Sequence, residues 1–192
     1  MKLVFATGNP GKIREASAIL SGYEIISPRD LGIFDEPEET GETFRENSLI
    51  KAEALWKATG LPCFADDSGL CVDALGGAPG VHSARYASES HDFDANIAKL
   101  LSALDGVEDR KAHFCCVATL ILDGKPVFFE GRCEGRISTE RYGRGGFGYD
   151  PVFIPDESPD GKTFAELGED FKNAIAHRGK ALRAMSAWLS KL

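Results

Sequence analysis

Long apolar runs, leader patterns and internal repeats are all absent from this chain of 192 residues. No apolar stretch approaches the roughly 18 residues that a membrane-spanning helix needs. The first residues enter a predicted strand directly, without the charged and apolar regions of a signal peptide. We therefore expect a cytoplasmic protein with no membrane partner.

Cysteine is also sparse, and its spacing does not suggest a metal site. The 5 cysteines are odd in number and include no C-x-x-C pair, which argues against both a disulfide framework and zinc. We expect them to be reduced and mostly buried. They are Cys63, Cys71, Cys115, Cys116 and Cys133.

The chain also has fewer positive than negative side chains. The chain has 22 lysines and arginines against 30 aspartates and glutamates, a net charge of −8. Such a chain is not a nonspecific nucleic-acid binder, so we expect no nucleic-acid partner. An anionic ligand must instead meet a local group of cations or a metal ion. With 43% hydrophobic residues, residues 1–192 can form a single domain with a buried core.

Apolar runs alternate with amphipathic stretches, which predicts an α/β fold with a mixed sheet. Gly60 is the expected stop of a long helix from Thr43, and Asp123-Gly124 is a strong hairpin turn. The predicted strands are 3–6, 24–27, 62–65, 112–122, 127–136 and 151–154, and the predicted helices are 13–20, 43–59, 94–104 and 172–192. Residues 28–42, 76–90, 142–150 and 155–171 are predicted to be mostly loop.

A glycine-rich turn between the first strand and the first helix is the strongest local signal. Glycines let backbone N–H groups approach an anion, a helix N-terminus carries partial positive charge, and lysine adds a full charge. The turn is not a Walker A loop, because it is shorter and no hydroxyl follows its lysine. It predicts phosphate binding, with a plain turn as the alternative. Its residues are Thr7, Gly8, Asn9, Pro10, Gly11 and Lys12.

Two neighbouring aspartates follow a short predicted strand. Asp66 and Asp67 precede Ser68 and Gly69, and we expect them at the carboxyl end of that strand, where α/β sheets bind ligands. Their side chains should point in opposite directions. One could then hold a divalent cation or accept a proton from water, while the other orients loop backbone. Buried carboxylates need compensating partners, which favours a site over the alternative, a solvated turn.

Glu39 precedes the long predicted helix and is a candidate partner for one of these aspartates. Mg²⁺ typically takes one or two protein carboxylates and completes its shell with water and phosphate oxygens. Glu39 could supply the second carboxylate. Its alternative role is an acid near a helix start that complements the helix dipole.

Cations occur at two further points where they could meet a ligand. Lys51, on the long predicted helix, could reach a phosphate. Lys172, His177 and Arg178 cluster near the start of the last predicted helix, and Arg178 is a forked donor suited to a carbonyl or phosphate. For both, the alternative is a solvated helix face.

A second glycine-rich loop carries aromatic residues. Phe147 could stack on a nucleobase, and Asp150 could accept a base N–H; a buried loop aromatic is the alternative. The segment also mimics an RNA-binding signature. Pro151 interrupts the strand that this signature needs, which argues against RNA binding.

Taken in order, these segments resemble the inosine triphosphate pyrophosphatase family, whose members hydrolyse non-canonical purine nucleoside triphosphates. The ordered set is far more specific than any single motif. The resemblance implies an elongated, two-lobed α/β fold with a central mixed β-sheet flanked by helices, an active-site cleft between the lobes, and a homodimer. The matching pieces are Thr7–Lys12, Glu39–Gly41, Asn47 with Lys51, Asp66–Gly69, Gly76–Gly80, Ser83–Tyr86, Gly145–Pro151, and Lys172 with His177–Gly179.

The resemblance also implies residue roles. Asp67 would be the general base and a Mg²⁺ ligand, with Glu39 as the second ligand. Ala176 stands where many relatives carry a serine. The implied substrate contacts are Thr7, Gly8, Asn9, Pro10, Gly11 and Lys12 at the triphosphate, Lys51 and Ser68, Phe147, Gly148, Tyr149 and Asp150 at the base, and Lys172, His177 and Arg178 at the base edge.

The implied reaction is the Mg²⁺-dependent hydrolysis of ITP, dITP and XTP to monophosphate and pyrophosphate, which cleanses the nucleotide pool. Water deprotonated by Asp67 would attack the α-phosphorus, while Lys12 and loop N–H groups stabilise the leaving pyrophosphate. Arg178 or His177 would satisfy O6 of the purine and Asp150 its N1–H, whereas adenine reverses both groups. The alternative is a nucleotide-binding module without turnover, which would need no metal-binding carboxylates.

Overall fold

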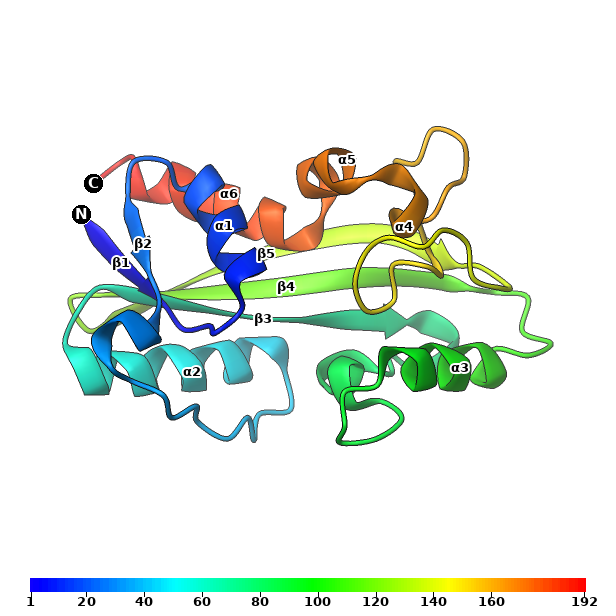
Figure 1. Cartoon of the computed structure of the whole chain (residues 1–192), viewed down its shortest axis with the longest axis horizontal. Coiled ribbons are helices and arrows are strands. Elements are labelled where there is room, and N and C mark those ends of the chain that lie inside the picture. Colours follow the sequence, from blue (N-terminus) through cyan, green and yellow to red (C-terminus); the bar gives the residue numbers. More distant parts are fainter. The chain divides into compact units, whose positions relative to one another are not determined.

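The computed structural model describes residues 1–192 and has an α/β fold built on a six-stranded mixed sheet (Figure 1). The strand order is β2-β1-β3-β4-β5-β6, with β1 parallel to β2 and β3, and β5 antiparallel to β6. The predicted fold class and mixed sheet are confirmed. The strands are β1 (Lys2–Phe5), β2 (Glu24–Ile26), β3 (Cys63–Val72), β4 (Lys111–Leu122), β5 (Lys125–Ile137) and β6 (Phe153–Pro155). The α-helices are α1 (Pro10–Ile19), α2 (Phe44–Thr59), α3 (Phe93–Ala103), α4 (Phe164–Leu167), α5 (Glu169–Ile175) and α6 (His177–Leu189), and the 3₁₀ helices are η1 (Pro28–Leu31), η2 (Asp73–Leu75) and η3 (Gly80–Arg85).

The chain divides into two compact units, and β3, β4 and β5 contribute residues to both. None of the helices is both long enough and apolar enough to cross a bilayer. The cleft between lobes implied by the resemblance stays a prediction. The first unit consists of Met1–Asp67, Cys116–Gly131 and His177–Leu192, and the second of Ser68–Cys115 and Arg132–Ala176.

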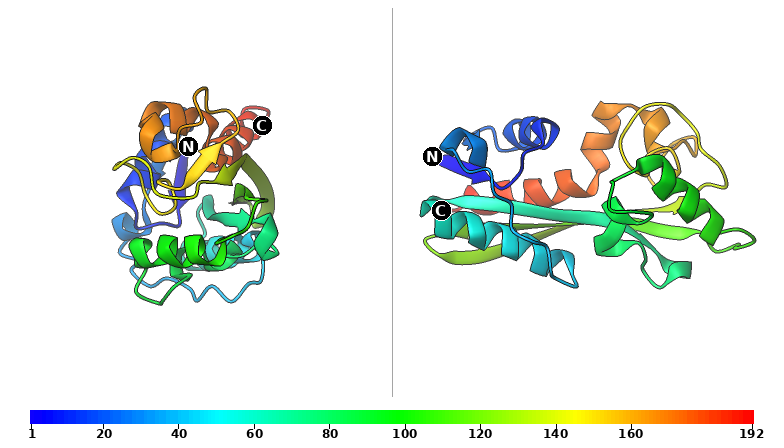
Figure 2. Two further views of the ribbon diagram at one scale, coloured as in Figure 1. Left: turned by 90° about the vertical axis from the view of Figure 1, so that its right-hand side faces the viewer. Right: turned by 60° about the horizontal axis from the view of Figure 1, so that its bottom comes forward.

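In the first unit, helices pack on both faces of the sheet (Figure 2). Side chains alternate along a strand, so successive residues of β3 belong to different cores. Phe64 packs with α1 and α6, whereas Cys63 and Ala65 pack with α2. Asp66 and Asp67 come next along β3 and continue this alternation.

The second unit has a separate core around α3, α4 and β6. Phe114 and Phe153 meet edge to face, with their ring centroids 4.7 Å apart. The Tyr149 hydroxyl donates a hydrogen bond to the backbone oxygen of Ser83 over 2.7 Å. This bond fixes the buried end of the second glycine-rich loop.

A predicted helix and a predicted hairpin turn are confirmed in the structure. Thr43 caps α2 through reciprocal hydrogen bonds with Glu46, and Gly60 ends the helix in the left-handed conformation. Asp123 and Gly124 both have positive φ, at 50° and 73°, as the tight turn between β4 and β5 requires.

The prediction that a strand ends at the aspartates is wrong. β3 continues through Asp66–Gly69 to Val72, because it stays paired with β4 beyond the point where β1 ends. The ion pairs of Asp66 and Asp67 compensate these carboxylates within the strand. Turn-forming residue types were therefore overridden by strand pairing and charge compensation.

Three other boundaries differ from the prediction. The first helix begins at Pro10 and not at Ile13, because the Asn9 side chain caps it. The segments 28–42, 76–90 and 155–171, predicted as mostly loop, contain η1, η3, α4 and the start of α5. The last helix is interrupted at Ala176, whose extended backbone separates α5 from α6.

Candidate active site

The side chain of Asp66 is buried in the first unit and ion-paired with two cations. Lys12 Nζ lies 2.9 Å from Oδ1, and Arg178 Nε lies 2.8 Å from Oδ2, while the Asp66 side chain is only 1% exposed. Burial alone would raise the pKa of this carboxyl, but Lys12, Arg178 and Lys51 hold the pKa well below its ordinary value. Asp66 thus binds side chains, and the prediction that one aspartate orients loop backbone is wrong.

Arg178 belongs to the same buried network. Its Nη1 lies 3.4 Å from Glu15 Oε2, on α1. Burial would lower the pKa of the guanidinium, but Asp66 raises it above its ordinary value. Gly131 on β5 permits this position of α6, because a Cβ there would lie 2.6 Å from the backbone nitrogen of Ala181. The alternative of a solvated basic face is therefore wrong for Arg178.

Asp67 faces the α2 side of the sheet and meets a different pair of residues. Lys51 Nζ lies 3.3 Å from Asp67 Oδ1 and 3.2 Å from Glu39 Oε1, so one ammonium group bridges the two carboxylates. The other oxygen of Asp67, Oδ2, is buried and has no hydrogen-bond partner. Burial raises the pKa of Asp67 to about 6, against the lowering effect of Lys51, and the charge of Glu39 adds to the rise.

Asn47 fixes the segment that carries Glu39. The backbone N–H of Gly41 donates to Asn47 Oδ1 over 2.7 Å, and a Cβ on Gly41 would lie 2.6 Å from that oxygen. Asn47 is itself buried one helical turn before Lys51. The sequence motifs included Asn47 without a role for it; the signal was its four-residue spacing from Lys51 together with the preceding Gly41.

The predicted phosphate loop lies beside β3, because the N–H of Ala6 donates to the backbone oxygen of Phe64 over 2.8 Å. Asn9 Oδ1 accepts the N–H groups of Gly11 and Lys12 over 2.8 Å and 3.4 Å. Further N–H groups of the loop are also bonded within the chain, that of Thr7 to Phe5 and that of Asn9 to Thr7. In this conformation, the Lys12 ammonium, the one cation of the loop, is therefore the main group that the loop offers to an anion.

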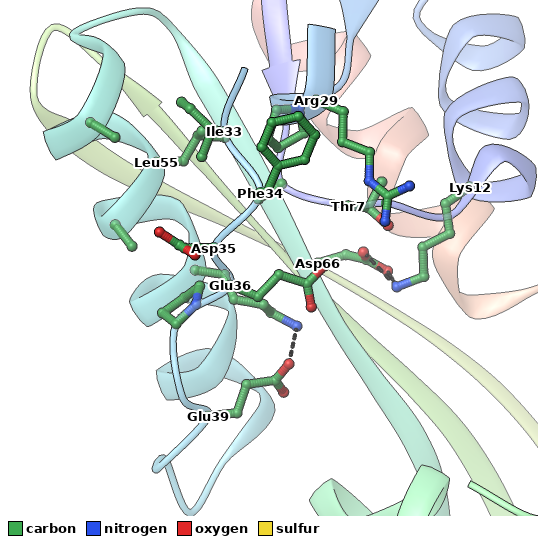
Figure 3. A pocket seen from close by; sticks show the side chains of 17 residues that line it. Thr7, Lys12, Arg29, Ile33, Phe34, Asp35, Glu36, Glu39, Leu55 and Asp66 are labelled. Carbon is green, nitrogen blue, oxygen red and sulfur yellow. Dashed lines mark hydrogen bonds and ion pairs between the residues drawn. The ribbon is translucent and has the colours of Figure 1, made fainter. Parts of the chain in front are cut away.

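A pocket of about 490 Å³ lies in the first unit, next to this loop (Figure 3). Thr7, Gly8, Lys12 and Asp66 line one part of it, and apolar residues of α2 line another. Asp67 does not line the pocket itself; its contacts Lys51 and Glu39 do. Arg29 and Phe34, which the sequence did not single out, are also lining residues.

In the second unit, the glycine-rich loop exposes Phe147 and buries Asp150. Phe147 is 64% exposed and packs edge to face on Phe93, so the alternative of a buried loop aromatic is wrong. Asp150 Oδ2 accepts the N–H of Phe147 over 2.7 Å and is ion-paired with Lys172. Gly146 makes room for this arrangement, since a Cβ there would collide with the Asp150 side chain.

The predicted site residues thus fall into two groups. The phosphate loop, Glu39, Lys51 and Asp67 belong to the first unit, as do His177 and Arg178 at the start of α6. Ser68, Lys172 and the segment Phe147–Asp150 belong to the second unit, where Tyr149 is buried against Ser83 and Gly148 has a positive φ of 61°. Within the first unit, the structure brings the predicted metal and phosphate residues together.

Comparisons with known proteins agree with the motif resemblance. The sequence profile of the Ham1 family matches residues 3–188. A dITP/XTP pyrophosphatase from Treponema denticola is 49% identical over 193 residues, covering 98% of each chain. Another from Porphyromonas gingivalis is 52% identical over 190 residues, covering 98% of this chain and 97% of the relative.

Solved structures give the same result. A HAM1 protein from Coxiella burnetii matches with a TM-score of 0.93 and 41% identity, covering 100% of both chains. The Staphylococcus aureus Ham1 protein matches with a TM-score of 0.91 and 42% identity, covering 100% of this chain and 99% of that one. The family resemblance is confirmed: this chain belongs to the Ham1 family.

Proposed function

We propose that this protein hydrolyses non-canonical purine nucleoside triphosphates, such as ITP, dITP and XTP, to the monophosphate and pyrophosphate. The observation that carries the proposal is Asp67, a buried carboxylate with a raised pKa and an unpartnered oxygen, held beside Lys51 and Glu39. A group of this kind suits proton abstraction from water. The names of the relatives from T. denticola and P. gingivalis support this substrate class.

The residues around Asp67 fit a Mg²⁺ ion. Asp67 Oδ2 is an acceptor without a partner, and Glu39 supplies a second carboxylate on the other side of Lys51 Nζ. Mg²⁺ usually takes one or two protein carboxylates and leaves its other positions to water and phosphate oxygens. When bound, the ion would offset negative charge on the phosphates and make water more acidic.

Side chains of this protein accept the proton and stabilise the negative charge that develops during the reaction. Asp67 accepts the proton as a water oxygen forms its bond to the α-phosphorus, and the bond from that phosphorus to the bridging oxygen breaks. Pyrophosphate leaves with the electron pair. Lys12, held in place by Asp66, stabilises the charge that develops on it. Lys51 holds the Asp67 carboxylate in position and favours its ionised form.

Residues of the second unit select the purine in this proposal. Phe147 offers an exposed ring for stacking. The Asp150–Lys172 pair presents an acceptor and a donor, which match N1–H and O6 of hypoxanthine and xanthine. Adenine presents the opposite groups and would leave both unpaired, which discriminates strongly. His177 and Arg178 remain further candidates for the base edge.

The proposal includes three properties that the family resemblance implies. Residues 1–192 act as one pyrophosphatase domain, which the profile match over residues 3–188 supports. The protein works as a homodimer and in the cytoplasm, without a nucleic-acid or membrane partner. Sedimentation of the purified protein would test the dimer directly.

The proposed function is tested by single-turnover product analysis with excess enzyme, Mg²⁺ and each of ITP, XTP, ATP and GTP. We expect equal amounts of monophosphate and pyrophosphate from ITP and XTP, and little product from ATP and GTP. Tight binding of ITP without products would support the nucleotide-binding module instead. Asp67→Asn should bind ITP and release pyrophosphate about 10²–10⁴-fold more slowly, and near-normal hydrolysis by this variant would overturn the role of Asp67.

A further inference from the structure

Arg29 differs from the other cations that line the pocket of the first unit. Lys12 is ion-paired with Asp66, and Lys51 with Glu39 and Asp67. Arg29 lines the same pocket, and its guanidinium forms no ion pair or hydrogen bond with another side chain. Asp35 and Glu36 line the pocket as well, but Arg29 is its one cation that is not paired with a carboxylate.

The guanidinium of Arg29 lies over the phosphate loop. Its Nη2, Cζ and Nε atoms are 3.6, 3.7 and 3.7 Å from the position that a Cβ on Gly8 would take. Because this Cβ position is nearly equidistant from three bonded atoms, it lies above the plane of the Arg29 guanidinium. The face of the guanidinium thus covers Gly8, and its N–H edge is left to a ligand. In Figure 3 the group extends toward Thr7 and Lys12.

The backbone around Arg29 is ordered by local hydrogen bonds. Ser27 and Asp30 form a reciprocal cap on η1, with the Ser27 N–H donating to Asp30 Oδ2 over 2.8 Å. Gly32 closes η1 in the left-handed conformation. Arg29 is thereby placed beside the loop without any hydrogen bond or ion pair from its own guanidinium.

The ion pairs of the pocket indicate which kind of ligand Arg29 could bind. Each lysine of the pocket is offset by a carboxylate, and the N–H groups of Gly11 and Lys12 are taken by Asn9. Arg29 is thus the cation of the pocket whose N–H groups are free to meet a phosphate oxygen. A planar guanidinium with parallel N–H donors suits two oxygens of a phosphate better than a lysine does.

We propose that Arg29 binds the pyrophosphate half of the substrate and the pyrophosphate product. This inference rests on the proposed function, since it assigns Arg29 to the leaving group of that reaction. Arg29 lies at Gly8, on the phosphate loop, whereas Asp67 and Glu39 lie around Lys51. It therefore distinguishes triphosphates from shorter phosphates and does not take part in activating water.

Calorimetric titration of the full-length protein with inorganic pyrophosphate tests this proposal without any turnover. Arg29→Ala should weaken pyrophosphate binding by about 10- to 100-fold, the range for hydrogen bonds to charged groups. Arg29→Lys should fall between that variant and the wild type, because it keeps the charge and loses the fork. Lys57→Ala removes one exposed positive charge on α2 away from the pocket and should bind pyrophosphate as the wild type does.

Two further measurements separate this proposal from the proposed function. The melting temperature of Arg29→Ala should be unchanged, because Arg29 is exposed and its side chain has no internal partner. Unchanged pyrophosphate affinity in Arg29→Ala would overturn the role of Arg29, even if the wild type hydrolyses ITP. A wild type that binds pyrophosphate but releases none from ITP would overturn the proposed function, while the binding comparison would still decide the role of Arg29.

Discussion

Asp66 and Asp67 are adjacent in the chain, yet their carboxylates are in opposite electrostatic environments. Asp66 is fully compensated by Lys12 and Arg178, and its pKa lies well below the ordinary value. Asp67 is buried with one oxygen unpartnered, and its pKa is raised to about 6. Strand alternation produces this difference, because it turns the two side chains to opposite faces of β3. One aspartate therefore stabilises the fold and the other is available for chemistry.

Replacing each aspartate by asparagine should separate these roles. Asp66→Asn leaves Lys12 and Arg178 without their shared anion and should lower the free energy of unfolding by about 3 kcal/mol, near the low end for a broken buried ion pair. We expect a value at the low end of the range because the side chains of Lys12 and Arg178 are still 25% and 20% exposed. Urea denaturation measures the change.

Asp67→Asn is the matched control on the same strand. Because the folded state raises the pKa of Asp67 from its ordinary value of 3.8 to about 6, ionised Asp67 destabilises the fold at pH 7. The asparagine variant should therefore be as stable as the wild type or more stable, with hydrolysis reduced by about 10²–10⁴-fold, the usual contribution of a general base. Equal losses of stability in both variants would contradict the division of roles.

The pKa of Asp67 should respond in opposite directions to its two charged neighbours. Lys51→Met removes a positive charge that favours the carboxylate, so the titration midpoint should rise above about 6. Glu39→Gln removes a negative charge, so the midpoint should fall. Carbon NMR of labelled aspartates in the metal-free protein measures both shifts. A midpoint that moves the same way in both variants would refute this electrostatic assignment.

Gly131 should be essential for the position of α6. A Cβ at this residue would lie 2.6 Å from the backbone nitrogen of Ala181, so Gly131→Ala forces the helix away from β5. We expect a loss of about 1–3 kcal/mol from overpacking, together with a weaker Arg178–Asp66 contact and lower activity. Thermal unfolding and ITP hydrolysis measure the two effects. Gly22→Ala is the control, because a Cβ there meets nothing within 4 Å.

Phe147 should contribute to substrate binding and not to stability. It is 64% exposed, so Phe147→Ala should unfold at the wild-type temperature. Loss of a stacking ring is worth about 1–3 kcal/mol per base, so KM for ITP should rise by about tenfold or more. Phe147→Tyr keeps a ring and should retain a near wild-type KM. A lower melting temperature with unchanged KM would show that the ring is structural.

Local signals predicted part of the fold well. Gly60 predicted the end of α2, and Asp123-Gly124 predicted the β4–β5 hairpin, because each signal depends on residues close in sequence. The end of β3 could not be predicted in this way. Its continuation depends on pairing with β4 and on ion pairs of Asp66, whose partners Lys12 and Arg178 are remote in sequence.

The same contrast between local signals and contacts remote in sequence applies to the site. Motif order identified Asp67, Glu39 and Lys51, and the structure brings these three together. The ion pairs of Asp66 and the position of Arg29 had no sequence signal, since a lone arginine in a short polar segment has no pattern. Which cation of the pocket lacks an ion pair depends on the folded structure alone.

Isotope incorporation tests hydrolysis at the α-phosphorus most directly. ITP is hydrolysed with Mg²⁺ in water that is labelled with a heavy oxygen isotope. The products are separated and analysed by phosphorus NMR and mass spectrometry. The proposed chemistry predicts IMP and pyrophosphate in equal amounts, with the heavy oxygen in IMP alone. Heavy oxygen in the pyrophosphate, or formation of IDP and phosphate, would contradict it.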